Sequence, residues 1–142
     1  MLLFYFSIAL TIISNVLYHI FQKLTPTNVN PMLALAVTYT TAAVICLLIL
    51  PFFPLTSSLV DSLRQLNWAS FALAFAIIGL ELGFLLAYRA GWNISQGPIV
   101  SNVAVALVLV PLGLLFFKER LSLINLIGIA VCVAGLVMVN QK

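Results

Sequence analysis

The sequence predicts an all-α integral membrane protein with five transmembrane helices, and two observations support this fold class. The first is composition: 64% of the 142 residues are hydrophobic, and only six basic and three acidic residues are present. Because a soluble domain carries about 25% charged residues, we expect hydrocarbon to be the solvent of this chain. The second is the length of its apolar runs. Since hydrocarbon offers the backbone no hydrogen-bond partners, each run must satisfy its own N–H and C=O groups as a helix.

The apolar runs divide the chain into helices in a regular order. Each run is long enough to cross about 30 Å of hydrocarbon, which takes roughly 20 helical residues. The helices are predicted at residues 2–22, 32–53, 68–88, 97–117 and 121–140. We expect the first to be a membrane helix and not a cleaved signal peptide, because no basic residue precedes it and no small-residue cleavage site follows it. Residues 1–142 are therefore predicted to form one five-helix membrane domain.

The sequence lacks the residues that several functions require. Cys46 and Cys132 lie inside apolar runs without metal-ligand spacing, and His19 is the only histidine, so we expect no metal site and no cofactor. Neither a catalytic triad nor a phosphate-binding glycine loop can be recognised, which argues against an enzyme. The formal net charge of +3 comes from residues on both sides of the predicted bundle, which is unlike a nucleic-acid-binding patch.

The basic residues are balanced between the two sides of the predicted bundle. On the side of the N-terminus lie Arg64, Lys118 and Arg120, and on the other side lie Lys23, Arg89 and Lys142. The positive-inside rule then favours neither orientation. A chain that inserts both ways can pair antiparallel with a second copy and so rebuild an inverted-repeat architecture. The alternative is that so few charges balance by accident.

The end of the chain resembles a known family. The segment FFKERLSLINLIGIAVCVAGLVMVN, residues 116–140, resembles the closing helices of the drug/metabolite transporter superfamily, specifically of one EamA-type domain. The matching features are the hinge Glu119, Arg120 and Leu121 and the glycines Gly128 and Gly135 in the last helix. The segment SNVLYHIFQK, residues 14–23, is similar to the first helix of these domains and of the small multidrug resistance proteins. The resemblance covers nearly the whole chain.

This resemblance implies one half of an inverted-repeat transporter, because full-length relatives join two five-helix halves and short relatives work as dimers. It implies transport of a small metabolite, or of a cationic or zwitterionic drug-like solute, across the plasma membrane by alternating access. The partner is expected to be an antiparallel second copy or a related subunit. The alternative is a non-transport or heterodimeric subunit, for example a component of a flippase for lipid-linked sugars.

Glu81 is the only acidic residue within the predicted membrane helices. Ionised and unpaired, it costs about 3 kcal/mol on insertion scales, so we expect it to be protonated, paired or facing water. At about 100° per residue, Gly79 and Gly83 share a face suited to close helix packing, whereas Glu81 lies on the opposite face with Tyr88 and Trp92.

We interpret this polar and aromatic stripe as the lining of a cavity in which Glu81 binds a cationic solute or carries a proton. The alternative is a structural glutamate paired with a residue such as Arg89 or Asn102. Tyr88 and Trp92 either contact the solute through their π faces or belong to the aromatic belt of the membrane interface.

A second polar stripe is predicted on the first helix. Asn15 lies eight residues before Lys23, where the small multidrug resistance proteins carry their essential carboxylate, so the resemblance does not extend to their proton-coupled antiport. Asn15 shares a helical face with His19 and Gln22, and we expect it to contact solute. For His19 a solute or proton role stands beside the alternative of an interfacial imidazole bound to the backbone.

The other helices supply the remaining candidates. Tyr39 and Asn102 are predicted to line the same cavity. Gly128, Cys132 and Gly135 form a stripe of small residues, which lets helix backbones approach closely. The default interpretation is helix packing, and the family resemblance implies that this stripe is a dimer contact.

Overall fold

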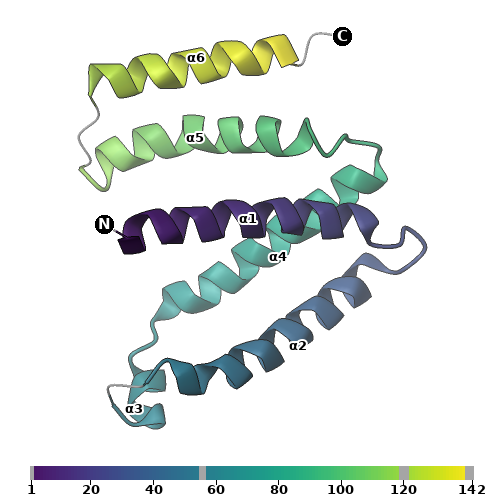
Figure 1. Cartoon of the computed structure of the whole chain (residues 1–142), viewed down its shortest axis with the longest axis vertical. Coiled ribbons are helices and arrows are strands. Elements are labelled where there is room, and N and C mark those ends of the chain that lie inside the picture. The colour runs from purple at the N-terminus through teal and green to yellow at the C-terminus, as the bar shows by residue number, and fades with distance from the viewer. Residues whose placement is uncertain (1, 55–56, 119–121, 140–142) are drawn as a thin grey trace. The chain divides into compact units, whose positions relative to one another are not determined.

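The computed structural model describes residues 2–54, 57–118 and 122–139, and within these ranges it is helical without strands (Figure 1). The long helices are α1 (Leu2–Leu24), α2 (Pro31–Ile49), α4 (Trp68–Arg89), α5 (Gly97–Leu115) and α6 (Leu123–Val139). A 3-10 turn, η1 (Leu50–Phe52), and a short helix, α3 (Leu59–Arg64), connect α2 to α4. The predicted all-α fold is confirmed.

Four helical stretches in the described residues are long and apolar enough to cross a membrane: α1, α2 extended through η1, α4 and α5. Helix α6 is also apolar, and its 17 residues rise by about 25 Å, close to the thickness of the hydrocarbon core. The helices begin and end within a few residues of the predicted spans. The hinge residues Glu119, Arg120 and Leu121, like Lys142, lie outside the described residues.

Local sequence signals explain where α2 and α4 begin. The Asn30 side chain accepts hydrogen bonds from the backbone N–H groups of Met32 and Leu33, at 2.9 and 3.4 Å, and Pro31 fills the first helical position. In the same way, the Asn67 side chain accepts a 2.9 Å bond from the N–H of Ala69 at the start of α4. Such caps satisfy backbone donors that have no partner in the first turn of a helix.

Helix α3 was not among the predicted elements. Ser58 caps it, because its hydroxyl accepts a 3.2 Å hydrogen bond from the Asp61 N–H and donates a 2.7 Å bond to the Asp61 carboxylate. The sequence signal for this helix is the spacing of serine and an acidic residue three positions apart, which is a reciprocal N-cap pattern. The α2–α4 connection is therefore partly helical.

The chain divides into two compact units, Met1–Ala90 and Gly91–Lys142. In the first unit α4 packs against both α1 and α2, and Figure 1 shows α4 crossing α1. In the second unit α5 and α6 pack together as an antiparallel pair. The single domain over residues 1–142 stays a prediction.

Buried side chains are few in the first unit and lie where the three long helices meet. Leu35 of α2, Leu85 and Tyr88 of α4 and His19 of α1 are buried. Most other apolar side chains face outward, which is the arrangement expected of helices whose solvent is lipid. Because His19 and Tyr88 belong to this small core, the core also separates polar side chains from lipid.

Candidate functional site

Glu81 lies on the inner face of α4, as predicted. Its side chain is half-buried among the helices of the first unit, while Gly79 and Gly83 are exposed on the other side of α4. A Cβ atom added at either glycine would meet nothing within 4 Å. The close helix packing predicted for this glycine pair is thus not formed among the described residues of the first unit.

A pocket of about 220 Å³ opens between α1, α2 and α4, with Glu81 in its wall. Its other lining residues are Tyr18, Phe21, Gln22, Thr25, Ala34, Leu35, Thr38 and Leu85. Glu81 lies eight residues before the last residue of α4, Arg89, which places it about 12 Å from that end of the helix. The pocket therefore lies within the membrane-spanning part of the first unit.

The hydroxyl of Tyr39 on α2 lies close enough to the Glu81 carboxyl group for the two to interact electrostatically. This hydroxyl is buried and has no hydrogen-bond partner of good geometry among the described residues.

Gln22 of α1 fixes the wall of the pocket next to Glu81. Its Nε2 donates to the Glu81 backbone carbonyl at 3.3 Å and to the Tyr18 hydroxyl at 3.3 Å. Tyr18 and Thr25 had not been predicted as part of a site. Tyr18 lies four residues before Gln22 on the same face of α1, and this spacing was a signal available in the sequence, whereas Thr25 follows the end of α1 at Leu24.

His19 and Tyr88 bind each other where α1 meets α4. The Tyr88 hydroxyl and His19 Nδ1 are 2.9 Å apart, and both side chains are buried. The Phe84 ring lies edge-on to His19, with 4.7 Å between centroids. Neither His19 nor Tyr88 lines the pocket. The structure thus brings these two predicted residues together as a contact between helices.

Arg89 and Lys23 bind backbone carbonyls at the end of the first unit that contains the His19–Tyr88 contact. Arg89 Nη2 donates to the backbone carbonyls of Pro26 and Val29, at 3.0 and 2.9 Å, in the loop between α1 and α2. Lys23 Nζ lies 3.4 Å from the Tyr88 carbonyl and 5.5 Å from the centre of the Tyr88 ring. Arg89, considered above as an ion-pair partner for Glu81, therefore holds a loop.

The remaining predicted residues lie elsewhere. Asn15 is exposed and does not line the pocket, since every described residue of α1 before Tyr18 is exposed. Trp92 and Asn102 belong to the second unit, where both are exposed.

A separate hollow of about 520 Å³ lies between α5 and α6 in the second unit. Asn102, Gly128 and Cys132 line it, whereas Gly135 does not. A Cβ atom at Gly128 or Gly135 would meet nothing within 4 Å. The two glycines of the predicted dimer stripe are therefore not in close contact with another helix among the described residues of the second unit.

The chemistry available at the Glu81 pocket is that of a carboxyl group, an amide and hydroxyls beside apolar side chains. No cluster of three or more metal-ligating side chains occurs in the part of the chain that the structure describes. A carboxylate with neighbouring hydroxyl and amide groups can bind an ammonium group or exchange a proton.

Fold and pocket together define a multi-pass integral membrane protein with a pocket of mixed polar and apolar lining between its helices. The chain matches the model of the EamA-like transporter family over residues 2–141, and it belongs to that family. No curated protein and no solved structure matches it. The protein is thus a membrane transporter of the EamA-like family.

Proposed function

We propose that this transporter moves a small cationic or zwitterionic solute across the plasma membrane by alternating access, with Glu81 as the acidic group that binds the solute or carries a proton. The observation that supports this most directly is the position of Glu81. It faces a pocket inside the membrane-spanning part of the protein, and the nearest basic residue on its own helix, Arg89, binds loop carbonyls instead.

The cost of this carboxyl group supports a functional role. An ionisable side chain inside a membrane is expensive, by about 3 kcal/mol on insertion scales, and faces a partner or a polar cavity. Here Tyr39, Gln22 and Tyr18 surround it with groups that can accompany a bound solute. The pocket volume of about 220 Å³ is below the roughly 300–1,000 Å³ of drug-sized ligand sites. A small solute is therefore favoured.

An antiparallel second copy is proposed as the other half of the transporter. The room beside Gly128 and Gly135 supports close approach by another helix. The charge distribution supports both orientations, because Lys23 and Arg89 lie together at one end of the first unit and Arg64 follows α2 at the other. In alternating access, each of the two antiparallel copies would then take the conformation that the other copy had before.

Glu81→Gln tests the proposal, since it removes the charge while keeping the size of the side chain. Uptake of labelled methylammonium, choline and lysine would be measured in proteoliposomes and normalised to folded protein. We expect a loss of at least about tenfold, which corresponds to about 1.4 kcal/mol. Asp61→Asn is the matched control, because Asp61 is exposed on α3, and it should transport normally. Full normalised transport by Glu81→Gln would remove Glu81 from the mechanism.

A further inference from the structure

The connection between α2 and α4 carries an exposed apolar surface that transport by the Glu81 pocket does not use. We propose that this surface is an in-plane membrane anchor, which contacts lipid at the level of the headgroups. The surface consists of Leu59, Val60, Leu63 and Leu66 and is called the α3 surface below. Their side chains are 54 to 58% exposed.

The location of α3 follows from its neighbours. Helix α2, extended through η1, and helix α4 both have the length and hydropathy of membrane spans. Helix α3 connects the end of one to the start of the other (Figure 1). We therefore expect it at the boundary between hydrocarbon and water. A short helix at that depth has lipid beside it on one side and water on the other.

The pattern of α3 matches this boundary. At about 100° per residue, Leu59, Val60 and Leu63 fall within one third of the helix circumference. Asp61 and Arg64 fall outside this arc, and both are exposed. The Ser58 cap fixes the start of the helix and so holds the two faces in this arrangement. An apolar face separated from charged side chains on the rest of the circumference is the pattern of helices that lie in a membrane interface.

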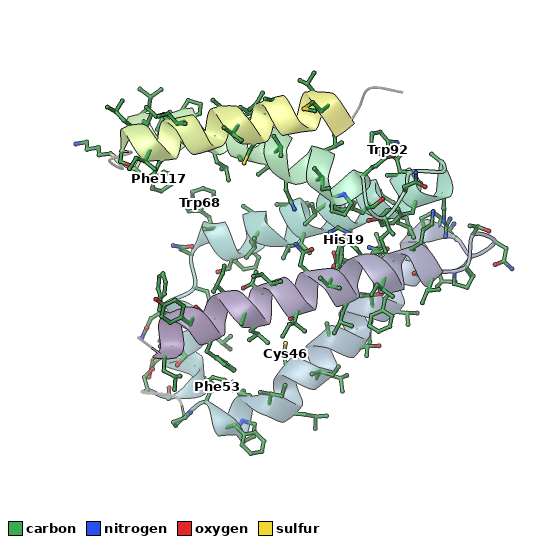
Figure 2. The ribbon with its side chains drawn as sticks, turned by 45° about the horizontal axis from the view of Figure 1, so that its top comes forward. His19, Cys46, Phe53, Trp68, Trp92 and Phe117 are labelled. Carbon is green, nitrogen blue, oxygen red and sulfur yellow. The ribbon has the colours of Figure 1, made fainter. Side chains whose placement is uncertain are left out.

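Aromatic side chains flank the α3 surface on both sides in sequence. Phe52 and Phe53 follow α2 and are 82 and 69% exposed, and Trp68 begins α4 and is 79% exposed. Figure 2 shows Phe53 and Trp68 at the end of the first unit where α3 lies. Tryptophan is enriched at membrane interfaces, where its ring spans the apolar and wet layers. These residues extend the lipid contact beyond α3.

Lipid fits this surface better than a second protein does. Four side chains are far fewer than the roughly 20–30 residues that each partner contributes to a standard protein interface. The described part of the connection carries one acidic residue, Asp61, and one basic residue, Arg64. Its contact with lipid therefore rests on apolar burial and requires no anionic lipid. An anchor of this kind suits either leaflet.

Spin labels at matched positions test the anchor. In a Cys46→Ser, Cys132→Ser background, Leu63→Cys and Gln65→Cys would each be labelled with a nitroxide and reconstituted in phosphatidylcholine vesicles. Both positions are exposed, so neither label disturbs packing. For each label we would measure the ratio of its collisions with oxygen to its collisions with a water-soluble nickel complex. We expect this ratio to be at least about tenfold higher at Leu63 than at Gln65. Adding phosphatidylglycerol should leave this ratio unchanged.

Three outcomes would overturn the anchor. Equal accessibility at the two positions would place the α3 surface in water. Spin–spin broadening at Leu63, lost on dilution with unlabelled protein, would show that a second copy covers it. A ratio that appears only with phosphatidylglycerol would mean that charge, and not apolar burial, holds the segment. None of these measurements depends on transport, so the test stands apart from the role of Glu81.

Discussion

His19 and Tyr88 illustrate how far a single side chain can be interpreted from sequence. Both were predicted as solute or proton contacts, because polar groups in membrane helices often line a cavity. In the structure they are buried against each other, with 2.9 Å between the Tyr88 hydroxyl and His19 Nδ1. The sequence pattern places each residue on the correct helix. It does not show that the two residues contact each other, because they lie 69 positions apart in the chain. Their position indicates a role in joining α1 to α4.

Tyr88→Phe should therefore lower stability and leave transport per folded molecule unchanged. A double-mutant cycle with His19→Leu, measured by unfolding in detergent, should give a coupling of about 0.6 kcal/mol, the average for side-chain hydrogen bonds within membrane proteins. Tyr5→Phe is the control, because Tyr5 is 64% exposed, and it should change nothing. Zero coupling together with lost transport would instead make Tyr88 a solute contact.

At the scale of the element, the long helices were predictable and their partners were not. The length and hydropathy of the apolar runs predicted the positions of α1, α2, α4 and α5 to within a few residues. Helix α3 was missed because six residues are too few for a periodic pattern, although the Ser58–Asp61 spacing was visible. Helical periodicity placed Glu81 opposite Gly79 and Gly83 correctly.

Asn15 shows the limit of the same periodicity. It shares a face of α1 with His19 and Gln22, yet only those two approach α4. All described residues of α1 before Tyr18 are exposed, because α1 and α4 cross and so contact each other over part of their length (Figure 1). A helical wheel gives direction around an axis and contains no information about where along the axis a neighbour lies.

The glycines of α6 give a prediction about helix contacts. If a second copy packs on the stripe, Gly135→Leu should weaken dimerisation in detergent by at least about tenfold, because a large side chain would separate the backbones. Val137→Leu, at a position that is 55% exposed, is the control and should have little effect. Gly128→Ala should leave the α5–α6 pair folded, since its Cβ would meet nothing within 4 Å. Equal effects of the two leucine variants would argue against this contact.

At the scale of the whole molecule, the basic residues are balanced between the two sides, so a few added charges should be enough to fix the orientation of the chain in the membrane. Two lysines added beside Arg64 should fix the N-terminus in the cytoplasm, whereas Thr27→Lys with Asn28→Lys should fix the opposite orientation. Reporters at the C-terminus that are active only inside or only outside the cell would measure both. The unmodified chain should give both signals, and each fixed form alone should be inactive.

Expressing the two fixed forms together should restore transport, because each supplies the orientation that the other lacks. If the unmodified chain and both variants share one orientation, the antiparallel second copy is excluded. A single orientation in the unmodified chain alone would favour a dedicated heterodimeric subunit, such as the flippase component considered above.

The separation between the bonded residues of α1 and α4 has a consequence for synthesis. Gln22 reaches Glu81 across 59 positions and His19 reaches Tyr88 across 69. At about 5–20 residues per second, a ribosome takes roughly 3 to 14 seconds to make that length of chain. During this interval the imidazole and the amide of α1 must be sheltered by water, lipid headgroups or the insertion machinery. The polar side chains of α1 thus lack their final partners until α4 has been synthesised.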